Sequence, residues 1–153
     1  MTNEDIARQT IEVIWCRGEV DRIPEFYTED FHAHQPNIRL NWTGIPGRPT
    51  WVGHEGLRNI VTWIKSVCPD YHEAPQLVVG SGDMVAMRMI NTGTHTGRAV
   101  GRFQPSGKSF EAVDTMFVRM VGGRIAEQWG LFDQHAVCVQ LGLIEPSELV
   151  IYG

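Results

Sequence analysis

The segment from Gly122 to Gly142 constrains the fold more than any other part of the chain. Gly122 and Gly123 predict a tight hairpin turn, because two adjacent glycines can adopt the positive φ angles that such a turn requires. The residues after the turn alternate between two faces of a predicted strand, with Ile125, Glu127, Trp129 and Leu131 on one face and Ala126, Gln128, Gly130 and Phe132 on the other. Asp133 is placed to cap a short helix over 134–141, and Gly142 is placed to end it.

Helices precede strands in the rest of the chain. Apolar residues at helical spacing predict a first helix that begins near Thr2 and ends at Gly18, and another helix over 54–67. Between them the sequence predicts a short helix over 21–27 and a short strand over 31–34. Further strands, bounded by turn-forming residues, are predicted over 71–79, 84–92 and 108–120. Helices at the front followed by hairpin-connected strands indicate an α+β fold.

The segment 35–53 has no clear periodicity and is rich in Pro, Gly and Asn. It also contains Trp42 and Trp51. Long irregular segments inside compact domains are usually functional or disordered, so we favour a lid or rim over a binding cavity. The alternative is a surface loop whose tryptophans pack for stability or across a dimer contact.

Length and charge restrict the class of protein. The 153 residues suit a single domain over 1–153, with 143–153 as a C-terminal extension. A net charge of −5 argues against nucleic acid or an anionic membrane as partner. The polar N-terminus does not resemble a signal peptide, and the odd number of three cysteines suits reduced thiols, so we expect a cytoplasmic protein.

Several short motifs resemble the SnoaL-like polyketide cyclases of the nuclear-transport-factor-2-like superfamily. The matching residues are Gly53-His54-Glu55-Gly56-Leu57-Arg58, Gly93-Thr94-His95-Thr96-Gly97, Gly123-Arg124-Ile125, Glu127, Trp129, Asp133 and Gln140-Leu141-Gly142. The resemblance covers roughly residues 4 to 142 in the expected order. It implies a cone-shaped, curved antiparallel sheet (the cystatin-like α+β barrel) with helices on its concave face, enclosing a pocket.

The resemblance also implies a chemistry. Members of the family close a ring by intramolecular aldol condensation without a metal or cofactor, using a carboxylate that deprotonates a carbon between two carbonyls. The family's acid/base Asp falls at Gly130 in this chain, and the supporting polar residue on the preceding strand falls at Met116. Both polar positions are therefore replaced, and Gly130 cannot transfer a proton.

Asp114 is the residue that we expect to act as acid/base instead. Strand alternation places Asp114 on the face of Met116, where apolar surroundings raise the pKa of a carboxyl group. Gln128 can donate to a carbonyl oxygen but cannot titrate, so an orienting role suits it as the partner of Asp114. The alternative is that Asp114 lies near the strand end, solvated or paired with an arginine such as Arg88.

Two histidines, His32 and His34, share a predicted strand face. A His-x-His pair can bind a metal, but we find no third ligand with suitable spacing and expect none. The family often places a His near His34 at the pocket mouth, so the resemblance implies a substrate contact there. His95 sits in a short turn-like setting and is expected to have a structural hydrogen-bonding role.

These interpretations define a predicted site. Its catalytic groups are Asp114, Gln128 and His34, and its substrate contacts are His32, Asn37, Trp51, Trp63, Met87, Met89, Met116, Gly130 and Phe132. The predicted ligand is a hydrophobic, carbonyl-bearing small molecule, and the predicted reaction is a cyclisation, an isomerisation or a dehydration.

Two further functions compete with catalysis. One is a small-molecule-binding module that has lost the acid/base, which the replacement at Gly130 favours. The other is a dimerisation domain whose sheet serves chiefly as an interface. In each case we expect a homodimer formed through the outer face of the sheet, because Trp129 and Leu131 are costly to leave in water.

Overall fold

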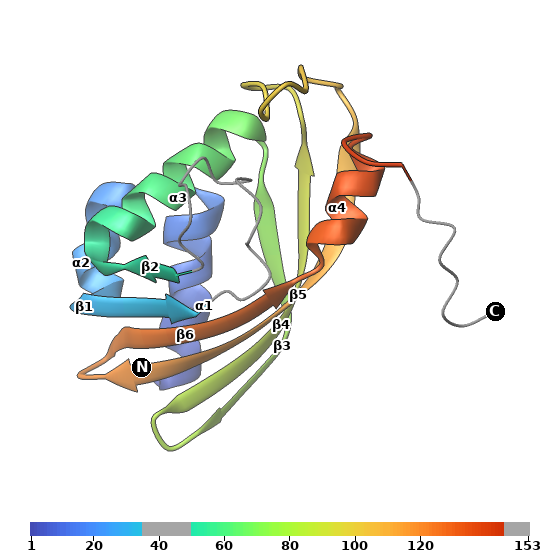
Figure 1. Cartoon of the computed structure of the whole chain (residues 1–153). Coiled ribbons are helices and arrows are strands. Elements are labelled where there is room, and N and C mark those ends of the chain that lie inside the picture. Colours follow the sequence, from blue (N-terminus) through green and yellow to red (C-terminus); the bar gives the residue numbers. More distant parts are fainter. Residues whose placement is uncertain (35–49, 146–153) are drawn as a thin grey trace.

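The computed structural model describes residues 1–34 and 50–145, and Figure 1 shows helices packed against one curved sheet. The helical segments are α1 (Asn3–Thr10), a π-helical continuation η1 (Ile11–Cys16), a 3-10 turn η2 (Val20–Arg22), α2 (Ile23–Phe26), α3 (Gly53–Val67) and α4 (Gln134–Gln140). The strands are β1 (Tyr27–His34), β2 (Thr50–Val52), β3 (His72–Ser81), β4 (Met84–Thr94), β5 (Ser109–Val121) and β6 (Arg124–Phe132). The α+β class is therefore confirmed.

The helices begin where the sequence supplies caps. The Thr2 side chain accepts a hydrogen bond from the Asp5 backbone, and the Asp5 carboxylate accepts one from the backbone of Thr2, which forms a capping box. The Asp133 carboxylate likewise accepts from the backbone N–H of Ala136 at 3.0 Å, as predicted. Leu57, Ile60 and Val61 form the buried face of α3, which fixes this helix against the sheet.

Within the described residues the sheet has six strands in the order β2-β1-β6-β5-β4-β3. All neighbouring pairs are antiparallel except β1 and β6, which run parallel. The prediction of an antiparallel sheet therefore holds for every pair except this one. The turn between β5 and β6 is the glycine pair Gly122-Gly123, whose φ angles are 57° and 74°. Strand β1 begins at Tyr27, four residues earlier than predicted, and its start replaces the end of the predicted short helix.

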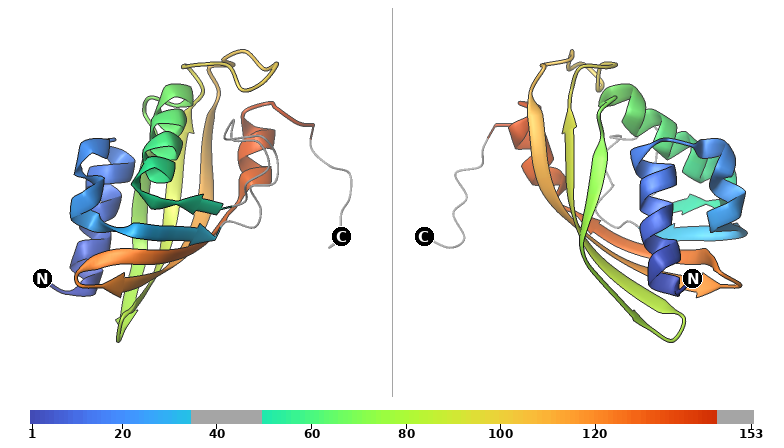
Figure 2. Two further views of the ribbon diagram at one scale, coloured as in Figure 1. Left: turned by 60° about the vertical axis from the view of Figure 1, so that its left-hand side comes forward. Right: turned by 180° about the vertical axis from the view of Figure 1, so that it is seen from behind.

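Helices α1, α2 and α3 cover the concave face of the sheet (Figure 2). Alternate residues of β4 and β5 point to this inner face, which is why their burial alternates along each strand. In β6 the alternation is interrupted, because the pairing register shifts between Met120–Ile125 and Arg119–Glu127. Ile125 is consequently buried in the core, and the prediction that it shares a face with Glu127 is wrong.

Two clusters of buried apolar residues fill the space between the sheet and the helices. The first lies under α1, η1, α2 and the middle of α3. The second lies at the end where α4 closes behind β6, and Leu143 belongs to it. The connection after β4 is tied to this end, since the backbone N–H of Gly97 donates to the Val67 carbonyl at 3.0 Å. A Cβ at Gly97 would collide with the carbonyl oxygen of Ser66, so the close approach requires glycine.

No helix among residues 1–34 and 50–145 is both long enough and apolar enough to cross a membrane.

Candidate functional site

Asp114 lies on the inner face of the sheet, as predicted. Its cross-strand neighbours are Met89 on β4 and Phe132 on β6, and Met116 follows it on the same face of β5. Only 7% of Asp114 is exposed. The alternative of an Arg88 partner is wrong, because Arg88 pairs with Thr115 and is exposed on the outer face.

Asp114 is the first member of a buried chain of hydrogen bonds. The Asn91 amide nitrogen, Nδ2, donates to Oδ2 of Asp114 at 3.1 Å and to the Tyr71 hydroxyl oxygen at 3.1 Å. The Tyr71 hydroxyl in turn donates to Oε1 of Glu73 at 2.6 Å. Glu73 reaches this position because it faces Asn91 across the β3–β4 ladder. Asp114, Asn91, Tyr71 and Glu73 are called the polar cluster below.

Burial changes the ionisation of both carboxyl groups in the polar cluster. Loss of water raises the pKa of Asp114 to about 6, although the hydrogen bond from Asn91 opposes the rise. Loss of water, followed by the nearby Asp114 charge, raises the pKa of Glu73 to about 8. At neutral pH the inner face therefore carries one ionised carboxylate and one neutral carboxylic acid. A carboxyl group whose pKa lies near the operating pH can act as a general acid or base.

Four oxygen atoms mark where the polar cluster could contact a ligand. Oδ1 of Asp114, Oδ1 of Asn91 and Oε2 of Glu73 are buried and have no hydrogen-bond partner in the described part of the chain. The Tyr71 hydroxyl oxygen forms hydrogen bonds with Glu73 and Asn91 of the same cluster. Unpartnered buried polar atoms are costly, so a ligand that satisfied them would bind favourably.

Gln128 also faces inward but does not join the polar cluster. It pairs with Val118, whereas Asp114 pairs with Phe132, four residues farther along β6. Four residues of strand correspond to roughly 13 Å. The prediction that Gln128 is the direct polar partner of Asp114 is therefore wrong, and Asn91 takes that place. Both polar atoms of the Gln128 amide are buried without a partner among the described residues, so Gln128 marks a second polar point deeper in the fold.

Met116 and Gly130 separate these two polar points. They face each other across the β5–β6 ladder, and Met87 faces Met116 on the other side. Both methionines are buried in the first cluster. Gly130 thus lies in an apolar stretch between Asp114 and Gln128.

His32 and His34 lie on the opposite side of the sheet from Asp114. The His34 ring stacks on Trp129 with centroids 5.3 Å apart, and its Nε2 lies 3.3 Å from Oε2 of Glu127. His32 stacks on His34 at 4.5 Å. Because Glu127 and Trp129 belong to the outer face of β6, the structure does not bring the two histidines together with Asp114. Their predicted catalytic and substrate contacts therefore have no support in this arrangement.

The remaining predicted residues divide into three groups. Trp63 packs against both apolar clusters and so lies where a pocket wall is expected. Asn37 and the side chain of Trp51 fall outside the described residues. His95 is fully buried, and its Nε2 lies 2.9 Å from the Arg98 carbonyl oxygen, which agrees with a structural role in the connection after β4.

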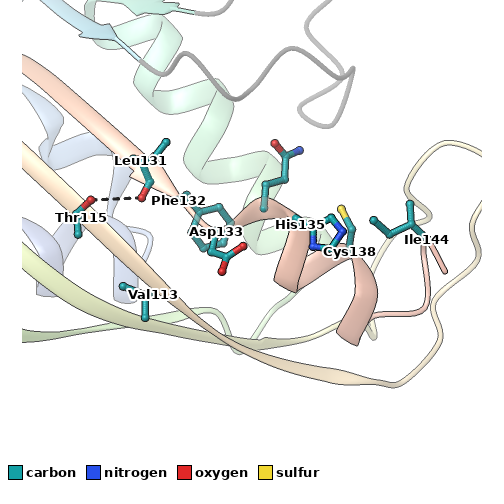
Figure 3. A pocket seen from close by; sticks show the side chains of 9 residues that line it. Val113, Thr115, Leu131, Phe132, Asp133, His135, Cys138 and Ile144 are labelled. Carbon is teal, nitrogen blue, oxygen red and sulfur yellow. Dashed lines mark hydrogen bonds between the residues drawn. The ribbon is translucent and has the colours of Figure 1, made fainter. Parts of the chain in front are cut away.

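A groove of about 680 Å³ lies on the outer side, between the sheet and α4 (Figure 3). It is lined by Val113, Thr115, Leu131, Phe132, Asp133, Gln134, His135, Cys138 and Ile144. Val113 and Thr115 flank Asp114 in the sequence but point to the other face. The groove therefore does not contain the polar cluster, and Asp133 within it serves as the cap of α4.

Sequence reasoning missed three of the four residues of the polar cluster. That Glu73 and Asn91 face each other follows from the β3–β4 register, which no short-range pattern fixes. One local signal existed. Tyr71 and Glu73 are two residues apart at a predicted strand, so burying the tyrosine ring would have turned the glutamate inward as well.

Comparison with known proteins shows the family to which the chain belongs. The chain matches the SnoaL-like polyketide cyclase family over residues 5–141. No curated protein matches it significantly. The structure of IdmH, a candidate polyketide cyclase from Streptomyces antibioticus, is 27% identical, covers 93% of this chain and 99% of its own, and superposes with a TM-score of 0.78.

Two other solved structures share the fold. A candidate polyketide cyclase from Bacillus cereus is 26% identical, with 91% of this chain and 79% of its own covered and a TM-score of 0.70. AclR, a candidate hydroxylase from Streptomyces galilaeus, is 18% identical over 97% of this chain and 86% of its own, with a TM-score of 0.75, which shows the fold alone. With most of its length matched, the chain belongs to the SnoaL-like polyketide cyclase family.

Proposed function

We propose that this protein is an acid–base catalyst that acts on a hydrophobic small molecule with an enolisable carbonyl group, and that Asp114 is the base. The observation that carries the proposal is the state of the Asp114 carboxylate. It is buried among apolar neighbours, Asn91 holds Oδ2, and Oδ1 has no partner within the described residues. A raised pKa of about 6 leaves the group mostly ionised at neutral pH yet basic enough to accept a proton.

The proposed step is a proton transfer by side chains of the protein. A C–H bond next to the carbonyl breaks, its electron pair forms the C=C bond of an enolate, and the proton goes to Oδ1 of Asp114. The enolate can then attack a second carbonyl to close a ring, or be reprotonated elsewhere to complete an isomerisation. Membership of the family favours ring closure, and the description of IdmH as a candidate polyketide cyclase supports it.

Hydrogen–deuterium exchange at an acidic carbon tests the step without knowledge of the natural substrate. We expect the protein to accelerate exchange at the central carbon of 1-phenylbutane-1,3-dione, an apolar probe. The variant Asp114→Asn keeps the side-chain shape, removes the titrating group and should abolish the acceleration. Thr115→Val, on the outer face beside it, is the matched control. Equal exchange rates with the parent protein and Asp114→Asn would contradict the proposal.

A binding module without catalysis is the second candidate. Its support is Gly130, which carries no carboxylate where the resemblance to the family places the acid/base residue. This function predicts that native mass spectrometry retains a hydrophobic ligand, while Asp114→Asn alters neither ligand retention nor any exchange rate. Gly130→Asp restores a carboxylate at the family position, and a gain of aldol cyclisation in that variant would identify the scaffold as a cyclase that lacks one residue.

A further inference from the structure

The polar cluster contains more than the base requires. An Asp114 held by Asn91 could accept a proton without the Tyr71–Glu73 pair. Yet the Tyr71 oxygen and Oδ2 of Asp114 both lie 3.1 Å from the same nitrogen, Nδ2 of Asn91. The hydroxyl and the carboxylate are thus close enough to contact neighbouring atoms of one small functional group.

We propose that Tyr71, supported by Glu73, donates a hydrogen bond to the carbonyl oxygen of the ligand while Asp114 removes the proton from the adjacent carbon. This assignment rests on the proposed function and names the chemistry of the ligand more closely. The group that is bound is a ketone or 1,3-dicarbonyl whose oxygen and acidic carbon are both presented to the inner face. As the C–H bond breaks, the carbonyl π electrons move onto the oxygen, and the Tyr71 donor stabilises the charge that develops there.

Glu73 determines whether Tyr71 can act as this donor. In the structure the Tyr71 hydrogen points to Oε1 of Glu73 across 2.6 Å. When Glu73 is neutral, its own proton can occupy the same line and be donated to the Tyr71 oxygen, which frees the Tyr71 hydrogen for a ligand. An ionised Glu73 can only accept hydrogen bonds, so the Tyr71 hydroxyl would continue to donate to it and not to a ligand. Keeping a carboxylic acid neutral by burial is a known way to make it a donor at neutral pH.

The surroundings of Glu73 favour the neutral state. Burial is the largest cause of its raised pKa, and the charge of Asp114 on β5 adds to it. The hydrogen bond from Tyr71 and, to a smaller extent, the Lys65 ammonium group on α3 act in the opposite direction. The Cys16 thiol on η1 contacts the Glu73 backbone through hydrogen bonds of 3.3 Å. Burial and the Asp114 charge outweigh the two opposing causes, and the pKa of Glu73 is about 8.

Binding of 4-nitrophenolate tests the donor directly, because a phenolate oxygen carries the partial negative charge of an enolate. The parent for this test is Asp114→Asn, which imitates the protonated Asp114 that is present once the enolate has formed. We expect this parent to bind 4-nitrophenolate, detected as a shift in its absorption band. Adding Tyr71→Phe should weaken binding about tenfold or more, the value of a lost hydrogen bond to a charged group. Tyr27→Phe is the matched control, since Tyr27 is also buried but bonds to Trp15 instead.

The pH dependence isolates the role of Glu73. Binding to the parent should weaken as pH rises through the Glu73 midpoint, which should lie below the value of about 8 because Asp114→Asn removes one of the charges that raise it. Adding Glu73→Gln should remove this loss, because the glutamine amide donates to Tyr71 at every pH. Equal affinity after Tyr71→Phe, no binding to the parent, or the same pH-dependent loss in the Glu73→Gln variant would each overturn the assignment. These outcomes differ from a failure of the proposed base, which appears only as unchanged exchange in Asp114→Asn.

Discussion

Gln128 and Asp114 lie on the same face of the sheet but in different cross-strand pairs, Gln128 beside Val118 and Asp114 beside Phe132. The side chain that contacts the Asp114 carboxylate is Asn91, whose Nδ2 donates to Oδ2 at 3.1 Å. Two inward-facing amides therefore have different effects on the acid. Asn91 lowers the pKa of Asp114, and Gln128 is too far away along the strand to do so.

This difference gives a matched pair of variants. Asn91→Leu removes the hydrogen bond that stabilises the ionised carboxylate, so the pKa of Asp114 should rise above its value of about 6. Gln128→Leu should leave that pKa unchanged. Carboxyl carbon chemical shifts, followed by NMR as a function of pH, measure both. A similar rise of the Asp114 pKa in both variants would contradict the finding that Gln128 is too far from Asp114 to affect it.

The buried glutamate makes stability depend on pH. The pKa of Glu73 is raised from 4.5 to about 8, so the folded protein keeps a proton that the unfolded chain releases. The free energy of unfolding should therefore fall as pH rises from about 4.5 through about 8. Glu73→Gln cannot titrate and should show a smaller fall over this interval. Urea denaturation at several pH values in this range measures the fall, and Glu29→Gln, at an exposed position, is the control. The same dependence of unfolding free energy on pH in the parent and in Glu73→Gln would contradict the prediction.

The core under α3 provides a stability test of the fold. Ile60 is 1% exposed, whereas Ile64 is half-buried, so the helix turns a slightly different face inward than its apolar spacing suggests. Ile60→Ala should lower the free energy of unfolding by roughly 2–5 kcal/mol, because it leaves a cavity in the first cluster. Ile64→Ala should cost less. Chemical denaturation of both variants measures the two losses in free energy of unfolding. A larger loss for Ile64→Ala would contradict the observed packing of α3, in which Ile60 is the more buried residue.

The outer face of the sheet suits self-association. Phe117 and Trp129 are cross-strand neighbours there, and they are 53% and 37% exposed. Leu131 is 61% exposed and Val113 is 38% exposed beside them. We propose that a second copy covers this face, because large apolar patches on a monomer are unfavourable in water. Analytical ultracentrifugation at micromolar concentration should show a dimer that Leu131→Asp dissociates, while a monomeric parent protein would contradict the proposal.

The framework of the sheet follows from local sequence. Residues of β4 and β5 alternate strictly, and Gly122-Gly123 supplies the turn angles that join β5 to β6, so the face of Asp114 could be predicted without the fold. The cap of α4 by Asp133 could also be predicted, because a helix cap depends only on the next few residues. Such features need no information from distant parts of the chain.

The features that failed depend on how the strands pair and on which face each presents to the core. A register shift beside the β5–β6 turn breaks the alternation at Ile125. On β1, Phe31 and Ala33 point into the core, so His32 and His34 point to the outer face. The polar cluster joins three segments through the order of the strands, so Glu73 and Asn91 carry no local sign that they meet Asp114. Side-chain period within one strand cannot supply that information, because cross-strand register is a tertiary property.

An NMR titration of the Asp114 carboxyl group tests the central claim most directly, since it needs no substrate. The resonance is assigned by its loss in Asp114→Asn and followed in the full-length protein. The account predicts a midpoint near pH 6, because burial outweighs the hydrogen bond from Asn91. A midpoint near the ordinary value of 3.8 would show that Asp114 is solvated and ionised throughout, and would contradict its assignment as the base.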